Sequence, residues 1–279
     1  MRADPRVLVF DSGLGGLTVF ARLAQMRPDG DYVYIADDEG FPYGALSEAA
    51  LVARVVALMR DLIVRHAPDL VVIACNTAST LVLPHLRAGW PQLPFVGTVP
   101  AVKPAAAASR SGLVSVLATP GTVTRDYTRA LIRDHAGAVE VKLVGSARLA
   151  PLAEAFMQGR PAPDDAIAAE IAPCFVEREA MRTDAIALAC THYPLLLEAF
   201  ARLAPWPVTW IDPAPAIARR VDHVLREHGF GPAPRGAREG VIEFTSGATP
   251  SAALEKALRF RGLAALGCAK PTVAMTPGL

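Results

Sequence analysis

Short hydrophobic runs of strand length alternate along the chain with longer segments in which hydrophobic residues have helical spacing. This alternation is typical of a parallel β-sheet covered by α-helices. It therefore predicts an α/β fold. The predicted strands are Val7 to Phe10, Tyr32 to Ala36, Leu70 to Ala74, Leu113 to Ala118, Val139 to Val144, Ala185 to Ala189, Val208 to Ile211 and Val241 to Thr245.

Two of the helical segments carry recognisable end signals. Hydrophobic residues recur every three or four positions from Leu51 to Leu62, and Ser47 precedes them as a residue type that caps helix N-termini. The segment from Ala216 to His228 has similar spacing and is followed by Gly229, which is a signal for a helix end. We expect a helix at each place.

Two of the predicted strands end in nearly the same sequence. Cys75 lies in VVIACNTAST and Cys190 in AIALACTHYP, so each hydrophobic run ends in Ala-Cys and continues with amide or hydroxyl residues. The two cysteines are about 115 residues apart, which is the length of one small α/β domain. We therefore predict two similar lobes, related by pseudo-twofold symmetry, with the carboxyl ends of their strands facing one cleft.

Two proline-rich stretches, residues 91–104 and 205–215, are the expected crossings between the lobes. The first lobe then comprises residues 1–98 together with 209–279, and the second comprises residues 99–208. Segments of this kind also permit hinge motion.

Composition narrows the class of protein. The 279 residues are 52% hydrophobic with a formal net charge of +1, and the arginines are spread along the chain. A nucleic acid is therefore not expected as the primary partner. No hydrophobic run reaches the roughly 20 residues of a membrane span, and the first residues leave no room for a signal peptide. We expect a soluble, cytoplasmic protein.

The cysteines favour acid-base chemistry over metal binding. The four, at positions 75, 174, 190 and 268, form no CxxC pair and no zinc-like cluster with histidine, so neither a metal site nor a disulfide framework is predicted. A thiolate is a good nucleophile and a usable base. Two thiols at matched positions suggest proton transfer at both faces of one substrate carbon. The alternative is that they are buried small hydrophobic residues.

The segment DSGLGG, residues 11–16, places glycines where a strand turns into a helix and frees backbone N–H groups for a carboxylate or phosphate. It matches neither G-x-G-x-x-G nor a P-loop, so dinucleotide binding is not favoured. Asp11 is a candidate site residue or a helix cap. Tyr43 and Gly44 form a turn that follows another strand end, and we expect it at the rim of the same cleft.

His192 follows Cys190 by two residues, close enough to form a hydrogen bond with the thiol and change its pKa. Asn76, Thr77 and Thr191 supply an amide and hydroxyls next to the cysteines, which suit the carboxylate and amine of an amino acid. Thr119 has two interpretations, as a further polar contact or as a helix cap.

The segments DSGLGGLTV, PYG, ACNTAS, ACTHYPLL and FTSG occur in the order and approximate spacing found in bacterial glutamate racemases, and the chain resembles that family over almost its whole length. It resembles the aspartate and hydantoin racemases less. The resemblance implies cofactor-independent interconversion of L- and D-glutamate, with D-glutamate supplied to peptidoglycan synthesis and thereby to cell-wall biogenesis and cell shape. It also implies a homodimer. The chain departs from the family's pattern at Asp38, where Thr is frequent, and at Ala248, where Asp is common.

The resemblance also assigns roles. Cys75 takes the proton from D-glutamate and Cys190 from L-glutamate, with Asp11, Glu154 and His192 as assisting acids and bases. The substrate contacts that it implies are Asp11, Ser12, Tyr43, Gly44, Asn76, Thr77, Thr119, Thr191 and His192.

Removal of the α-hydrogen of an amino acid needs a dry, electrostatically stabilising site or an electron-sink cofactor. The chain has four lysines, none in a recognisable pyridoxal context, so no cofactor is expected. The nearest alternative is a racemase of another acidic amino acid such as aspartate. Two further alternatives are a non-catalytic amino-acid or phosphate-binding protein and a hydrolase or transferase that uses a single cysteine.

Overall fold

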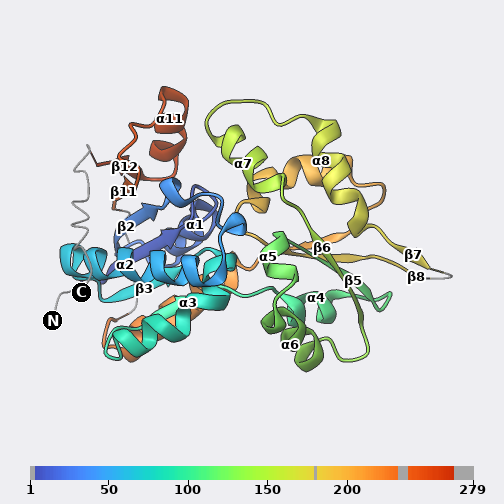
Figure 1. Ribbon diagram of the computed structural model, residues 1–279, viewed down its shortest axis with the longest axis horizontal. Coiled ribbons are helices and arrows are strands. Elements are labelled where there is room, and N and C mark those ends of the chain that lie inside the picture. Colours follow the sequence, from blue (N-terminus) through green and yellow to red (C-terminus); the bar gives the residue numbers. More distant parts are fainter. Residues whose placement is uncertain (1–3, 179–180, 232–237, 267–279) are drawn as a thin grey trace.

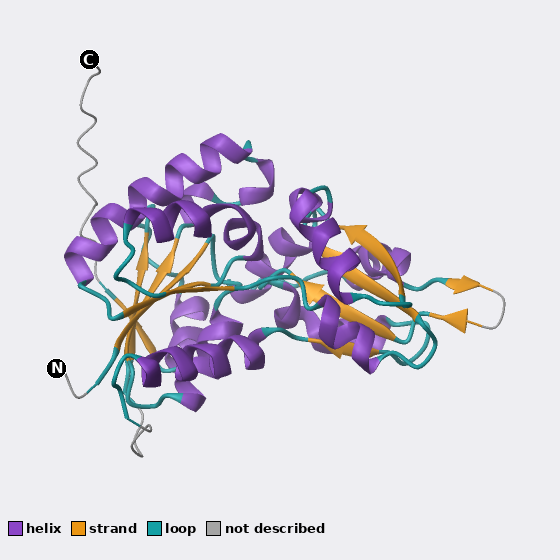
Figure 2. Ribbon diagram, turned by 90° about the horizontal axis from the view of Figure 1, so that it is seen from below, coloured by secondary structure: helices purple, strands orange, loops and turns teal. Residues whose placement is uncertain are grey.

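The computed structural model describes residues 4–178, 181–231 and 238–266, and it contains two separate parallel sheets, each covered by helices (Figures 1 and 2). The α/β class is therefore confirmed. The first sheet has the strand order β12-β11-β2-β1-β3-β4 and the second β10-β9-β5-β6. Cys268 lies outside the described residues.

The first sheet consists of β1 (Arg6–Asp11), β2 (Asp31–Ala36), β3 (Leu70–Ile73), β4 (Phe95–Gly97), β11 (Gly240–Phe244) and β12 (Leu263–Ala265). Its helices are α1 (Leu17–Met26), α2 (Glu48–His66), α3 (Asn76–Gly89), α10 (Ala214–Glu227) and α11 (Ala252–Phe260). Along β1, Val7 and Val9 pack toward the hydrophobic cluster that includes α1 and α10, whereas Leu8 and Phe10 pack toward α2 and α3. Because both faces are covered, the central strands are hydrophobic throughout.

The second sheet consists of β5 (Leu113–Ala118), β6 (Glu140–Gly145), β9 (Ala185–Ala189) and β10 (Thr209–Ile211). Helices α7 (Leu149–Met157), α8 (Asp164–Ile171) and α9 (Leu197–Leu203) contribute to the hydrophobic cluster on one face. Helix α4 (Val102–Ala108) and residues of α5 (Pro120–Val123) and α6 (Asp126–His135) contribute to the cluster on the other face. A small hairpin, β7 (Glu177–Arg178) with β8 (Met181–Arg182), projects from the far end of this sheet (Figure 2). Single turns of 3-10 helix are η1 (Asp38–Gly40), η2 (Tyr43–Ala45), η3 (Ala172–Cys174) and η4 (Tyr193–Leu196).

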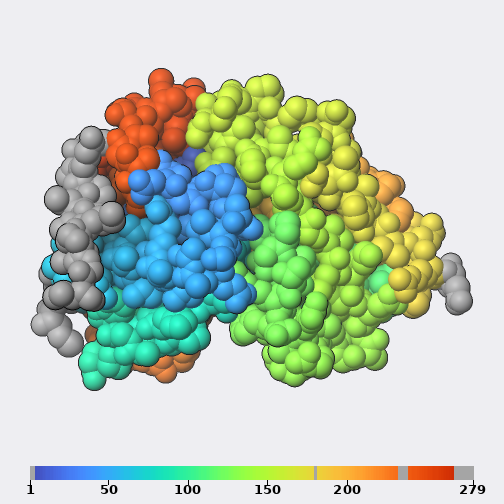
Figure 3. Space-filling view, viewed as in Figure 1, coloured from blue at the N-terminus to red at the C-terminus, as the bar shows by residue number. Residues whose placement is uncertain are grey.

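The two sheets repeat one strand order. Numbered by their order along the chain, the first four strands of the first sheet lie side by side as second, first, third and fourth (β2, β1, β3, β4). The four strands of the second sheet are arranged in the same way, as β6, β5, β9 and β10. Cys75 and Cys190 both come after the third strand of their sheet. In the space-filling view the two halves of the molecule pack directly against each other (Figure 3).

The repeat explains one difference from the predicted lobe boundary. The predicted boundary places residues 209–211 in the first lobe, but β10 pairs with β9 in the second sheet, where it takes the place that β4 has in the first. The chain therefore returns to the first sheet after Ile211. Three short pieces, β4, β12 and the β7–β8 hairpin, are strands that the hydrophobic pattern does not predict.

The expected helix ends are confirmed. Ser47 caps α2 by accepting a hydrogen bond from the N–H of Ala50, and α10 ends at Glu227, with Gly229 at a positive φ of 85° just beyond it. Within the described ranges, no helix combines the length and hydrophobicity required to cross a bilayer.

Candidate active site

The predicted site residues come together where the carboxyl ends of β1, β3 and β9 meet between the two halves. Asp11 is the last residue of β1, Cys75 is the N-cap residue of α3, and Cys190 follows β9 directly. All three are buried. The first turn of α3, a helix of 14 residues, therefore points its free N–H groups into this region, an arrangement suited to a carboxylate.

Cys190 belongs to a three-residue chain of polar contacts. Its sulfur lies 3.8 Å from Nδ1 of His192, and Nε2 of the same imidazole lies 2.8 Å from Oε1 of Glu154 on α7. Burial lowers the pKa of His192, but its hydrogen bonds with Cys190 and Glu154 outweigh this effect and raise the pKa well above its ordinary value. The imidazolium form therefore persists at neutral pH and stabilises negative charge on the neighbouring sulfur.

Cys75 has different surroundings. Its sulfur lies 3.5 Å from the hydroxyl of Ser12, and no imidazole contacts it among the described residues. Burial and the carboxylate of Asp11 raise the pKa of Cys75 to about 12, although the hydrogen bond with Ser12 opposes the shift. Cys75 is therefore a thiol in the resting protein. Burial also raises the pKa of Asp11, whose carboxylate accepts hydrogen bonds from the N–H of Gly13 and, at 3.0 Å, from the hydroxyl of Thr191.

The glycines of residues 13–16 allow the two halves to approach each other closely. The backbone N–H of Leu14 donates to Oε1 of Glu154 at 2.5 Å, and the hydroxyl of Thr18 donates to the carbonyl of Thr191. A Cβ at Gly13 would lie 2.1 Å from Oε1 of Glu154. The absence of side chains here is thus what lets Glu154 and His192 reach the first sheet.

Gly15→Ala is expected to lower the catalytic rate about tenfold, because the new Cβ would lie 2.5 Å from Nδ1 of His192 and 2.7 Å from its backbone nitrogen. Rotation of the imidazole alone does not relieve the backbone contact, so the two halves must separate slightly. The control is Gly89→Ala, since apart from its own chain neighbours and helix backbone no atom lies within 4 Å of a Cβ there. Steady-state rates of both variants test this, and an unchanged rate in Gly15→Ala would contradict it.

A group of hydroxyls connects α3 to the second sheet. Thr77 Oγ1 lies 3.0 Å from Thr119 Oγ1, and both contact Thr122. Asn76 accepts a hydrogen bond from Thr98 through its Oδ1, at 3.4 Å, whereas none of the described residues accepts one from its Nδ2. A buried amide donor without a partner is suited to a ligand carboxylate.

Tyr43 and Gly44 also lie near the second sheet, but the tyrosine hydroxyl does not face it. That hydroxyl donates to Asp37, and the side chain is buried. A Cβ at Gly44 would lie 3.9 Å from that of Thr119. The backbone of this turn is therefore the part that borders the site.

Three further residues contact the site and carry no recognisable signal in the sequence. Arg125 donates from Nη1 to the carbonyl of Thr77, at 2.5 Å, and to the hydroxyl of Thr80. The ring of Phe41 lies 5.4 Å from that of His192, and Thr98 is the partner of Asn76. In the described part of the chain, no group of three or more histidine, cysteine or acidic side chains is arranged to hold a metal ion.

Comparison with known proteins points in one direction. The chain matches the family described as Asp/Glu/Hydantoin racemase over residues 17–221. It is 56% identical to the glutamate racemase of Sinorhizobium fredii and 57% identical to that of Sinorhizobium medicae, each over 227 residues, which are 81% of this chain and 85% and 84% of the relatives.

Solved structures agree with this. The fold is similar to that of Escherichia coli glutamate racemase in complex with L-glutamate and the activator UDP-MurNAc-Ala, with a TM-score of 0.84 and 38% identity over 95% of this chain and 98% of that one. The glutamate racemase RacE1 of Bacillus anthracis has the same fold, with a TM-score of 0.80 and 24% identity over 97% of this chain and 99% of that one.

Proposed function

Because the chain belongs to the Asp/Glu/hydantoin racemase family, we propose that it interconverts L- and D-glutamate without a cofactor, by proton transfer between the α-carbon and the thiols of Cys75 and Cys190. The observation that carries this proposal is the pair of buried sulfurs, contributed by equivalent positions of the two sheets, with the Ser12 hydroxyl beside one and the His192 imidazole beside the other. The relatives named glutamate racemase, at 56% identity, support glutamate over aspartate.

The surroundings of the two thiols suit L-glutamate. Cys190, held beside the imidazolium of His192, serves as the thiolate base that removes the α-proton, and the thiol of Cys75 delivers a proton to the opposite face. For D-glutamate the roles reverse, with Cys75 as the base. Asp11 fixes the positions of Thr191 and Gly13 by accepting hydrogen bonds from the hydroxyl of Thr191 and the backbone N–H of Gly13.

The same geometry supports substrate binding. The N-terminus of α3, with Asn76 and Thr77 in its first turn, attracts a carboxylate of the substrate. The hydroxyls of Ser12, Thr119 and Thr191 and the backbone of Gly44 supply further donors. Closure of the two halves excludes water from the site, and the N-terminus of α3 stabilises the negative charge that develops at the α-carbon.

The test is racemisation of each enantiomer in D₂O without added cofactor. We expect loss of optical activity together with incorporation of deuterium at the α-position, with L- and D-glutamate converted at least about tenfold faster than the aspartate enantiomers. Saturable binding without exchange would indicate a binding protein, and a stable covalent adduct would indicate a single-cysteine transferase. If aspartate is converted faster than glutamate, the substrate is aspartate and the proposal of glutamate is wrong.

For the wider role, we propose that the product D-glutamate is used in the cytoplasm for peptidoglycan synthesis and that the protein is a homodimer. The relatives named glutamate racemase support D-glutamate as the product. Light scattering of the purified protein measures the second, and a monomer mass at working concentrations would refute it.

A further inference from the structure

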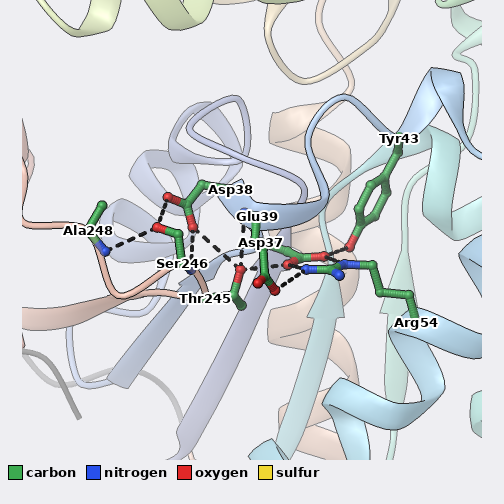
Figure 4. Close-up of polar contacts among 8 residues, drawn as sticks. All are labelled: Asp37, Asp38, Glu39, Tyr43, Arg54, Thr245, Ser246 and Ala248. Carbon is green, nitrogen blue, oxygen red and sulfur yellow. Dashed lines mark hydrogen bonds and ion pairs between the residues drawn. The ribbon is translucent and has the colours of Figure 1, made fainter. Parts of the chain in front are cut away.

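Outside the two cysteine centres, one buried carboxylate collects an unusual number of donors. Asp37 directly follows β2 and is fully buried. Oδ2 accepts from Nε of Arg54 at 2.7 Å and from the hydroxyl of Tyr43, and Oδ1 accepts from Nη2 of Arg54 and from the hydroxyl of Thr245, both at 2.6 Å (Figure 4). Burial of a carboxylate destabilises a fold unless the charge is paired and its oxygens accept hydrogen bonds, and both oxygens of Asp37 do so.

Arg54 is the only charged partner of Asp37 in the described part of the chain, and the neighbouring backbone leaves room for it. It projects from α2, and a Cβ at Gly40 would lie 2.4 Å from its Nε and 2.8 Å from Oδ2 of Asp37. The glycine therefore allows the guanidinium to bind both carboxylate oxygens as a fork.

A second carboxylate fixes the other side of this network. Asp38 accepts from the backbone N–H of Ser246 at 3.0 Å and from its hydroxyl, which in turn accepts from the N–H of Ala248 at 3.1 Å (Figure 4). The turn after β11 is thereby held in place, and with it Thr245. Asp38 and Ala248, the two departures from the family's pattern, thus lie in one connected group of residues.

Through Asp37, Arg54 acts on the turn that borders the candidate active site. The Tyr43 hydroxyl is bound to Asp37, and the ring belongs to the same hydrophobic cluster as Cys75. Gly44, the next residue, is the one that approaches Thr119, which directly follows β5 of the second sheet. The position of Gly44 is therefore determined by a chain of contacts that begins at Arg54.

We propose that Arg54 is a positioning residue for substrate binding: it fixes Asp37, which fixes Tyr43 and so presents the backbone of residues 43 and 44 to the substrate. This inference rests on the proposed racemase function. It assigns Arg54 to binding that is equally strong in the ground state and the transition state, since the turn contacts no reacting atom.

The experiment is steady-state kinetics of Arg54→Ala with both enantiomers. We expect KM to rise about tenfold while kcat stays within about twofold, because loss of uniform binding acts on KM alone. Arg54→Lys retains the charge but not the fork, and it should show an intermediate KM. Because Arg54 is 27% exposed, methylguanidinium added to Arg54→Ala should enter the vacated space and lower KM again, whereas methylammonium at equal ionic strength should not.

The matched control is Arg65→Ala. Arg65 lies on the same helix and pairs with Asp61 at 2.8 Å and with Glu243 on β11 at 2.9 Å, and among the described residues it makes no direct polar contact with Asp37 or with residues 42–44. Its kinetics should be unchanged. If the wild-type protein racemises glutamate and Arg54→Ala has a normal KM, the inference is wrong and the proposed function stands. If Arg54→Ala does not fold, a normal KM in Arg54→Lys overturns the inference equally. An inactive wild type refutes the function itself.

Discussion

Replacement of either Cys75 or Cys190 by alanine is expected to lower the rate of glutamate racemisation at least about 10³-fold. Each thiol supplies one half of a proton exchange, so a carbanion formed at one face finds no acid at the other face once its partner is removed. Both side chains are small and follow the carboxyl ends of their strands, so replacement by alanine leaves only a small cavity and should not disturb the fold. Initial rates with each enantiomer, measured by circular dichroism, give the loss.

Cys174 provides the matched control for both variants. It is also buried, and burial alone raises its pKa to about 12. Its side chain packs in the hydrophobic cluster of the second sheet, in η3 rather than at the end of a strand of either sheet. Cys174→Ala should therefore keep kcat within about threefold of the wild type. Racemisation at more than about one tenth of the wild-type rate in either active-site variant would contradict a mechanism with two thiols.

Serine variants separate the roles of the two thiols. L- and D-glutamate have equal free energies in water, so kcat/KM must be the same in both directions for every variant, and the difference must appear elsewhere. In Cys75→Ser, proton transfer at position 75 becomes the slowest step, so α-deuterated D-glutamate should show a primary isotope effect and α-deuterated L-glutamate a smaller one. Cys190→Ser should reverse this order. Equal isotope effects for both enantiomers in both variants would refute the assignment of one thiol to each face.

The positions of the two sulfurs follow from the sequence because each ends a continuous hydrophobic run, and parallel strands in an α/β fold place such ends at one edge of the sheet. For the third strand of each repeat, the sequence therefore predicts both that the segment is a strand and at which end of the sheet its cysteine lies. For β10, the hydrophobic run is too short to predict this much. A segment of three residues, Thr209–Ile211, predicts an extended conformation but not the sheet that the strand joins, because that depends on pairing with β9.

The supporting residues of the site are less visible in the sequence. Arg54 and Arg125 contact partners 17 and 45 to 48 residues away, and a charged residue on a helix has the same local pattern whether it faces water or a buried carboxylate. Glu154 lies 38 residues from His192, and the hydrophobic segment around it predicts only a helix. Its place in the site came from resemblance alone, and the contact with His192 now gives it a physical reason.

Replacement of His192 by alanine is expected to lower kcat about 10²-fold. Its imidazole lies between the sulfur of Cys190 and Oε1 of Glu154, so its loss removes the positive charge beside the thiolate and the link to α7. The matched control is His223→Ala. His223 also pairs with a glutamate, Glu227, at 3.3 Å, but on the exposed side of α10, and its removal should leave kcat unchanged. A fall of less than about threefold in His192→Ala would refute the role of the imidazole.

Glu154→Gln tests the same unit through its pH dependence. Glu154 helps to raise the pKa of His192, so its replacement by a neutral amide lowers that pKa. The imidazolium is lost as the pH rises through this pKa, and the alkaline limb of kcat should therefore move to lower pH in the variant, while the acid limb stays in place. A general weakening of the contact between the two halves would instead lower kcat equally at every pH. An unshifted alkaline limb would assign Glu154 to its hydrogen bond with the N–H of Leu14 and remove it from the proton-transfer unit.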